Sequence, residues 1–490
     1  MSEPIVVDIE WLNAAGDGVA RHRQREITVP FTIPGERVRV SLPPSPPRDA
    51  RSLQGRILDI LRPSPHRVVA RCAHFGPNAE GGGPCGGCAW QHIAYPEQLR
   101  LKTGIVSRLV AAALPGAPDV RPMLPATPLS DPWGYRHKVH FVVDESQFMG
   151  HYVRGSRRIV PVYECPVHDE RGNRLAFALA DALNRSTTTG AAPARRSSRS
   201  QRAGGAGRSA IDRADGADRS RRPARSTTLE SVAIRVAGAS DEVMATLVVR
   251  DDGDRYLRNA TRAVLDGQEA PTSLHINLHP RDDGYIFGRE TRRITGPARL
   301  REVVAGTTFL ISPTAFFQTN VRAAELLVSL VLDVIPPAVP VLDLYAGAGL
   351  FALPLARAGH AVVAIEENRE AVADGEASLR LNGIAPASCR FIAQPVETAL
   401  HRAAGRRPPR PDTVVVLDPP REGCSAAVVE GVFADVQPRL AVYISCNPEA
   451  LARDLAAAAA HGYRVQSLQP VDMFPHTAHI ETVAVLERRG

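Results

Sequence analysis

The sequence predicts an α/β protein with three parts: a small N-terminal β-barrel, an α+β central domain that carries a cysteine cluster, and a doubly wound C-terminal domain. Short strand-like runs fill residues 1–62, four cysteines lie within residues 63–300, and strands alternate with helices over residues 301–490. A chain of 490 residues is long enough for about three domains of ~150 residues each. We take these three ranges as the expected domains.

The first domain consists of short strand-like runs separated by turn residues. The runs "PIVVDIEWL", "EITVPFT", "RVRVSL" and "QGRILDIL" are rich in β-branched residues, and "AAGDG", "IPGE" and "PPSPPR" lie between them. Several short strands in so few residues predict a small barrel, and small barrels often bind oligonucleotides. A barrel that serves only as a structural cap is the alternative.

The central domain contains one segment of unusual composition, residues 185–228. It has eleven Arg and three Asp, a net charge of +8, and almost nothing that a core could bury, so we expect it to be disordered. The whole chain has a net charge of +7, which leaves −1 for the remainder. The basic composition is therefore no sign of a binding face. The segment is either an RNA-contacting arm or a dispensable insertion.

Cysteine usage points to a metal site and not to disulfides. Seven cysteines occur, an odd number, in a chain without the pattern of a signal peptide. Cys72, Cys85 and Cys88 lie in "RCAHFGPNAEGGGPCGGCAWQH", and Cys165 follows in "YECPVHD". A C-x-x-C pair with two outlying cysteines is typical of an intracellular metal site. Four thiolates suit Zn²⁺ and an iron–sulfur cluster equally well.

The C-terminal domain alternates apolar strands with helical runs. The strands are "PVLDLYAGAG", "AVVAIEEN", "DTVVVLDPP", "LAVYISC" and "ETVAVLE", with helical runs such as "REAVADGEASLRLNG" and "PEALARDLAAAAAHG" between them. This order predicts a mostly parallel sheet with helices on both faces. Such sheets bind ligands at the carboxyl ends of their strands, so we look for functional residues there.

The first two strand ends indicate an adenosine ligand. Gly347 and Gly349 follow the first strand, where glycines let the backbone approach a ligand closely. Glu366 ends the next strand, about twenty residues later, where a carboxylate can accept both ribose hydroxyls. Each feature alone would also fit a plain structural turn.

The next two strand ends carry an acid and a cysteine. Asp418 is followed by two prolines, which stiffen the turn and fix the carboxylate at the ligand edge. Cys446 ends "AVYISC" and precedes Asn447, a good helix N-cap, and Pro448. A helix N-terminus stabilises a thiolate, so we expect a lowered pKa and a nucleophile at Cys446. A buried structural cysteine is the alternative.

Two further stretches complete the expected site. Glu481 opens the last strand after a loop with His and Pro, and it is either a general base near the cysteine or a solvated side chain. The stretch "PTAFFQTN" precedes the first strand of the sheet. Phe316 and Phe317 can stack on a ring or fill the core, and Gln318 and Asn320 can bind an amide or a base edge.

The motifs "FFQTN", "DLYAGAGLF", "IEEN", "DPPREG", "SCNP" and "HIETV", in this order, resemble the RNA uracil-5-methyltransferase family. Residues 1–62 resemble the small RNA-binding barrel known as the TRAM domain. The resemblance implies a Rossmann-like class I methyltransferase domain. It implies Cys446 as nucleophile and Glu481 as proton acceptor. It also implies an S-adenosylmethionine site at Gln318, Tyr345, Glu366 and Asp418.

The chemistry of the family explains these residue types. A thiolate that adds to C6 of uracil makes C5 nucleophilic, C5 takes the methyl group, and a base removes the C5 proton so that the cysteine can leave. The rivals are a nitrogen-directed methyltransferase, which needs no thiolate, and an RNA-binding protein without activity. Cys389 and Cys424 match nothing in this scheme, and we expect them to be structural.

The resemblance also bears on the metal, the substrate and the location. It favours a [4Fe–4S] cluster at Cys72, Cys85, Cys88 and Cys165 over zinc, because rRNA-modifying members carry one on this pattern. The barrel and the cysteine set favour 23S rRNA over tRNA as the structured RNA substrate. No apolar run reaches the ~18 residues of a membrane span. We expect a cytoplasmic monomer that has no contact with a membrane.

Overall fold

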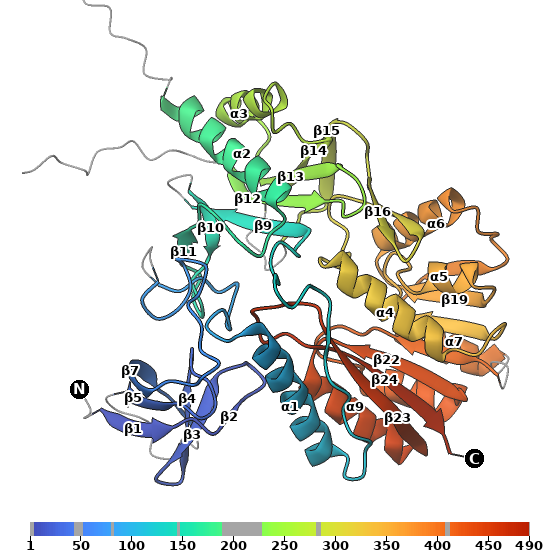
Figure 1. The fold of residues 1–490 in the computed structure, drawn as a ribbon. Helices are drawn as coiled ribbons and strands as arrows, with labels where there is room; N and C mark the ends of the chain where they lie inside the picture. The colour runs from blue at the N-terminus through green and yellow to red at the C-terminus, as the bar shows by residue number, and fades with distance from the viewer. Residues whose placement is uncertain are drawn as a thin grey trace, which may run out of the picture.

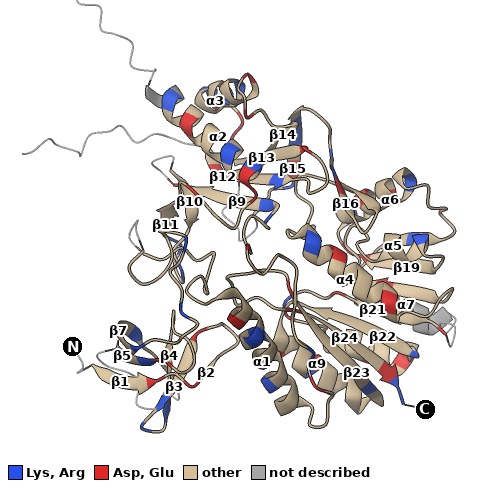
Figure 2. Ribbon diagram, in the orientation of Figure 1, with Lys and Arg blue, Asp and Glu red and all other residues tan. Residues whose placement is uncertain are grey.

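The computed structural model describes residues 4–43, 52–79, 83–144, 148–188, 228–280, 286–406 and 412–489. In Figure 1 the blue N-terminal strands, the green central sheet and the orange-to-red C-terminal sheet form three parts. Within the described residues, acidic and basic side chains are interspersed over all three parts (Figure 2). No helix among them is long and apolar enough to cross a membrane.

The N-terminal part is a pair of small sheets around one core. One sheet has the order β1-β5-β7 and the other β2-β3-β4-β6. Side chains alternate between core and solvent along β5, with Val38 and Val40 buried, as the period of two in a strand requires. The bounds are β1 Ile5–Asp8, β2 Trp11–Leu12, β3 Gly18–His22, β4 Arg25–Val29, β5 Arg37–Ser41, β6 Ser52–Gln54 and β7 Arg56–Arg62.

The central part is a seven-stranded sheet of order β11-β10-β9-β12-β13-β14-β15, with α2 and α3 packed against each other and on its apolar face. Its bounds are β9 Lys138–Val143, β10 Met149–Tyr152, β11 Ile159–Pro161, α2 Glu170–Thr188, β12 Leu229–Val236, β13 Val243–Val249, α3 Arg255–Leu265, β14 Ser273–Leu278 and β15 Glu290–Thr295. A hairpin of β16 Leu300–Val304 and β17 Thr307–Ile311 follows.

We expected residues 185–228, the Arg-rich segment, to be disordered. Helix α2 extends into the start of this segment. The helix continues to Thr188, so the first four residues of that segment are helical. Residues 189–227 of the segment lie outside the described residues.

The C-terminal sheet has the order β20-β19-β18-β21-β22-β24-β23-β8. Strands β18 to β22 are parallel, and β24 runs antiparallel between β22 and β23, which confirms the predicted mostly parallel α/β domain. The strands are β18 Pro340–Leu344, β19 Ala361–Glu366, β20 Cys389–Ala393, β21 Val414–Leu417, β22 Leu440–Ser445, β23 Tyr463–Asp472 and β24 Glu481–Arg488. The helices are α4 Val321–Val334, α5 Ala352–Arg357, α6 Arg369–Leu381, α7 Val396–Arg406, α8 Ala426–Glu430, the π-helical turn η1 Gly431–Val436, and α9 Pro448–Ala460.

Two elements from the range 63–300 belong structurally to the C-terminal sheet. Strand β8 (Leu124–Pro125) pairs in parallel with β23, and α1 (Tyr95–Ala113) packs against α9 (Figure 1). The apolar face of α1, with Ile105 and Val106, lies in one hydrophobic cluster with Leu451 of α9. The domain boundary at residue 300 remains a prediction. The contacts of α1 and β8 with the C-terminal sheet cross this boundary. Hydrophobic periodicity marks the apolar face of a helix and not its partner.

Candidate active site

The candidate site lies at the carboxyl edge of the C-terminal sheet. Leu344 at the end of β18 pairs with Ile365 in β19 and Leu417 in β21, and Leu417 pairs with Tyr443 in β22. Because these strands are parallel and in register, the residues that follow them lie along one edge. The motifs therefore converge although they are spread over more than a hundred positions.

The turn after β18 is shaped by left-handed backbone conformations. Tyr345 has φ of 62°, Gly347 54° and Gly349 88°. A Cβ at Gly349 would lie 2.8 Å from Cζ of Phe391, so only glycine allows this close packing. Tyr345 is half-buried, and burial raises the pKa of its phenol, which stays a hydrogen-bond donor.

Glu366 joins this turn to the end of β19. Its Oε2 accepts a hydrogen bond from the amide of Gly347 at 2.9 Å, and its Oε1 accepts one from the amide of Asn368 at 2.7 Å. Each carboxylate oxygen has a second lone pair. The carboxylate is thus oriented by the protein and can still accept hydrogen bonds from a ligand, as we predicted for ribose hydroxyls.

Asp343 is a residue that the sequence reasoning passed over. It is fully buried at the end of β18, and neither carboxyl oxygen has a hydrogen-bond partner in normal geometry among the described residues. Burial, together with Asp418 and Glu366, raises its pKa well above the usual range. A buried carboxyl group supported only by a poorly aligned hydrogen bond from the amide of Ala352 is costly and often marks a functional position. The available signal was an acid that ends an apolar strand directly before the glycine turn.

Asp418 follows β21, and its amide donates a hydrogen bond to the carbonyl of Leu344 at 3.3 Å. Burial raises the pKa of its carboxyl to about 7. The two prolines that follow offer no amide donors, which leaves the carboxyl without the backbone bonds that would lower its pKa.

The expectation of a lowered thiol pKa at Cys446 is wrong. Asn447 does cap α9, since its side chain accepts the amide of Glu449 at 3.0 Å. However, burial, followed by the charges of Glu481 and Asp418, raises the pKa of the Cys446 thiol to about 12, and Arg421 opposes this only in part. A helix terminus contributes ~0.3–1 kcal/mol, which is less than the cost of burying a thiolate beside two carboxylates.

Glu481 opens β24 and is 5% exposed. Burial and Asp418 raise its pKa well above the usual range, while Arg421 lowers it. Cys446, Asp418 and Glu481 therefore form one electrostatically coupled group. A carboxyl group with a raised pKa is a better proton acceptor than an ordinary one once it is ionised.

The loop before α4 contains residues that stabilise the fold and residues whose side chains can still bind a ligand. Asn320 is the N-cap of α4: its Oδ1 accepts the amide of Ala323 at 3.2 Å, and its Nδ2 donates to the carbonyl of Met473 at 2.9 Å. Phe317 is buried in the core, whereas Phe316 is 70% exposed. Gln318 is 9% exposed, and its side chain makes no hydrogen bond to another described residue, so it is available to a ligand.

The four cysteines of the predicted metal site line one cavity of about 460 Å³ in the central part. All four are free thiols. Burial, together with the neighbouring Cys85 and Cys72, raises the pKa of Cys88 to about 12, so these thiols lie close together. A metal ion displaces such protons and relieves the crowding.

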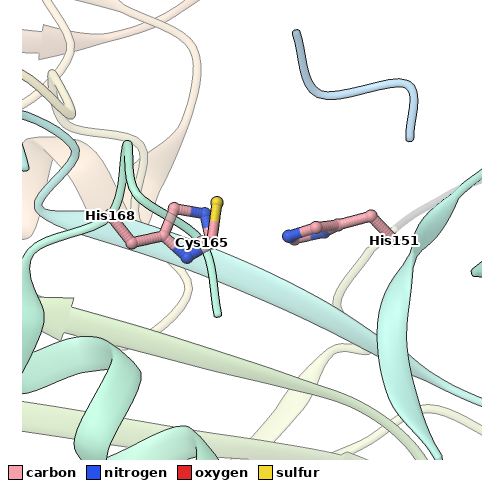
Figure 3. Close-up of side chains that lie close together, drawn as sticks. All are labelled: His151, Cys165 and His168. Atoms are coloured by element: carbon pink, nitrogen blue, oxygen red, sulfur yellow. The ribbon is translucent and has the colours of Figure 1, made fainter. Parts of the chain in front are cut away.

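The same cavity is lined by histidines that the sequence reasoning missed, among them His151 and His168. Figure 3 shows His151 of β10 facing Cys165 and His168, and the possible ligand atoms of the three residues lie within 4.8 Å of one another. Burial lowers the pKa of His151 to about 3, which keeps its ring in the neutral form that binds metals. The C-x-x-H spacing of Cys165 and His168 was the available signal.

Comparison with known proteins identifies the family of the chain. Residues 239–489 match the family described as tRNA (uracil-5-)-methyltransferase. An uncharacterised RNA methyltransferase of Gloeobacter violaceus is 35% identical and covers 99% of this chain and 97% of its own. One from Halalkalibacterium halodurans is 29% identical over 100% of this chain and 98% of its own.

Among solved structures, the tRNA (uracil-54, C5)-methyltransferase of Pyrococcus abyssi in complex with S-adenosyl-L-homocysteine has a TM-score of 0.72. It is 23% identical, and the match covers 98% of this chain and 100% of that chain, so the likeness concerns the fold. The family match spans half of the sequence, and the relatives span nearly all of it. The chain therefore belongs to the RNA uracil-5-methyltransferase family and is an RNA uracil-5-methyltransferase.

Proposed function

We propose that this enzyme methylates C5 of a uridine in structured RNA with S-adenosylmethionine as methyl donor, through a covalent bond between Cys446 and C6. The observation that carries the proposal is the pairing of Ser445 with Thr482, which brings Cys446 and Glu481 to one strand edge, where both are electrostatically coupled with Asp418. It unites a half-buried thiol, as nucleophile, with a buried carboxyl group, as proton acceptor. A nitrogen-directed methyltransferase has no need of a thiolate there.

The residues proposed for the methyl donor are Gln318, Tyr345, Glu366 and Asp418. When bound, S-adenosylmethionine supplies an electrophilic methyl group. Glu366 is oriented by two backbone amides, and Gln318 has no protein partner among the described residues, so both fit a polar ligand. The Pyrococcus enzyme binds S-adenosyl-L-homocysteine, which is S-adenosylmethionine without the methyl group, and this supports the proposed cofactor.

The proposed steps at the uracil ring conserve atoms and electrons. The thiol proton of Cys446 passes to solvent, its sulfur bonds to C6, and the electron pair of the C5–C6 double bond moves to C5 and on to the O4 carbonyl as an enolate. After C5 has gained the methyl group, Glu481 takes the C5 proton. The electrons of that C–H bond restore the double bond and expel the Cys446 thiolate. The target base must leave its stack to reach the buried thiol.

The test uses RNA in which 5-fluorouridine replaces uridine, because fluorine cannot leave as a proton does. With S-adenosylmethionine we expect a protein–RNA band on a denaturing gel for the wild type and none for Cys446→Ala. No band with either protein, on RNA shown to bind, would favour the nitrogen-directed enzyme or the RNA-binding protein without activity.

For the substrate we propose 23S rRNA, with tRNA as the second candidate. The second candidate is favoured by a specific observation: a tRNA enzyme has this fold over 98% of the chain. The N-terminal barrel is thus compatible with either RNA. Methylation assays with undermethylated total rRNA and tRNA, each with the Cys446→Ala variant as blank, decide between them.

For the cysteine cavity we propose a [4Fe–4S] cluster held by Cys72, Cys85, Cys88 and Cys165, with a structural role near the RNA-binding surface. Four free thiols around one cavity of about 460 Å³ fit this group. Zinc is the alternative, and it is favoured by the compact set of His151, Cys165 and His168. Iron, sulfide and zinc analysis of anaerobically purified protein distinguishes the two.

A further inference from the structure

The loop that leads into Glu481 is held by other parts of the chain. We define the base loop as residues 473–480, between β23 and β24. Four consecutive carbonyls of this loop accept hydrogen bonds from distant segments. Asn320 donates to Met473 at 2.9 Å, Lys102 donates to Phe474 at 3.0 Å, Tyr135 donates to Pro475 at 2.9 Å, and the amides of Ala89 and Trp90 donate to His476 at 2.9 Å.

His476 is the centre of this arrangement. Its amide donates to Oε1 of Gln98 at 2.8 Å, and its Nδ1 lies 3.1 Å from Nε2 of Gln98. Its Nε2 lies 3.1 Å from the carbonyl of Pro132, and its ring stacks on Trp133 with 3.8 Å between centroids. A neutral ring with the proton on Nε2 satisfies both nitrogens.

The backbone of His476 is strained, which indicates a functional constraint. Its φ of 64° lies in the left-handed region, which residues other than glycine rarely adopt. The side chain is 4% exposed, and Gln98 is fully buried. Strain of this kind persists only where the surroundings over-determine the conformation, and it concentrates near active sites.

The hydrogen bonds of the base loop join the sheet edge that carries Glu481 to the other parts of the molecule. Ala89 and Trp90 directly follow Cys88 of the cysteine cavity, and the indole of Trp90 donates to the carbonyl of Gly16 in the N-terminal part at 2.8 Å. Lys102 also pairs with Asp472 at 2.6 Å, and both side chains are fully buried. Glu481 pairs with Val471 at the end of β23, and the contacts of the base loop constrain how the chain enters β24 at this pair.

We propose that Gln98, Tyr135 and His476 are positioning residues that hold Glu481 within reach of the C5 proton. The inference rests on the proposed function, in which Glu481 acts after the methyl group has been transferred. Proton abstraction needs a heavy-atom separation of ~2.6–3.2 Å, and a displacement of ~1 Å can cost about 10²-fold in rate. A looser base loop therefore slows the release of the adduct and leaves its formation unchanged.

The experiment compares two substitutions of the same chemistry. Tyr135→Phe removes the hydrogen bond to Pro475 in the base loop. Tyr463→Phe removes an equally buried bond, from the Tyr463 hydroxyl to the carbonyl of Pro438 at 2.7 Å, in another part of the protein. With ordinary uridine RNA and S-adenosylmethionine, we expect a several-fold accumulation of the covalent adduct on a denaturing gel for Tyr135→Phe only. Both variants should lose similar thermal stability.

A second variant, His476→Asn, keeps a residue type that tolerates the left-handed backbone but removes the ring and its stacking. We expect it to accumulate more adduct than Tyr135→Phe, while the rate of adduct formation on 5-fluorouridine RNA changes less than about twofold. The proposal is overturned if formation and release slow equally, if neither variant accumulates adduct, or if Tyr463→Phe accumulates it as well. Absence of any adduct from the wild type on 5-fluorouridine RNA would instead remove the proposed function itself.

Discussion

The chain places thiols in two buried regions whose neighbours are very different. At the strand edge, Cys446 is alone and faces two carboxyl groups, Asp418 and Glu481. In the central cavity, four thiols face one another and the rings of His151 and His168. Burial raises the thiol pKa in both regions, so the pKa by itself does not separate them. The neighbouring side chains distinguish the two regions. Carboxyl groups can take up a proton, whereas clustered thiols and imidazoles can share a metal ion.

The largest effect is expected for the lone thiol. Cys446→Ala should reduce methylation by roughly 10⁴-fold or more, since no other residue can form the bond to C6. The matched control is Cys424→Ala, which removes a buried thiol of the same part whose pKa is also raised to about 12, whereas Cys446 is half-buried. It should cost stability and preserve turnover, as measured by transfer of a labelled methyl group. Equal losses in both variants would erase the distinction between nucleophile and core cysteine.

The next effect concerns the carboxyl that faces the thiol. Glu481→Gln should slow turnover by about 10²–10⁴-fold and should leave a stable adduct on ordinary uridine RNA, because the amide cannot accept the C5 proton. Glu487→Gln at the other end of β24 is the control, since Glu487 bonds to Gln466 far from the strand edge. Gel detection of the adduct measures both, and a rapid turnover in Glu481→Gln would contradict the assignment of the base.

Substitutions in the cysteine cavity should affect turnover less than those at the strand edge, and their main effects should be on metal content and thermal stability. Cys88→Ser should remove most of the bound metal and should lower the melting temperature, because the remaining thiols keep only part of the coordination. Cys389→Ser, at a cysteine that is 2% exposed in the C-terminal core, should lower the melting temperature and keep the metal content. Metal analysis and thermal unfolding measure these outcomes. If Cys88→Ser retains a full complement of metal, the cavity is no four-cysteine site.

The last comparison is the pH dependence of the lone thiol. With a pKa of about 12, the Cys446 thiolate fraction rises about tenfold for each pH unit across the neutral range. The rate of adduct formation on 5-fluorouridine RNA under single-turnover conditions should therefore increase from pH 6 to pH 9. A plateau that begins near pH 7 would instead indicate that bound RNA and cofactor lower the thiol pKa.

Several features of the fold and site were outside the reach of sequence reasoning. Helix α1 was assigned to the central domain, yet it packs on α9, and its Gln98 reaches His476, which is 378 positions away. Asp343 looked like an ordinary strand residue until its full burial beside Asp418 was visible. The polar motif residue Asn320 turned out to be a helix cap. In each case the deciding contact is made by residues that are distant in sequence.

The sequence by itself determined the family, the α/β fold and the row of candidate site residues along one sheet edge. It could do so because parallel strands place their carboxyl ends together, so the order of the motifs already implies their proximity. Only the tertiary structure revealed the raised pKa of the Cys446 thiol, the proximity of His151 and His168 to Cys165, and the hydrogen bonds that hold the base loop. These depend on burial and on distances through space, which local pattern and spacing leave open.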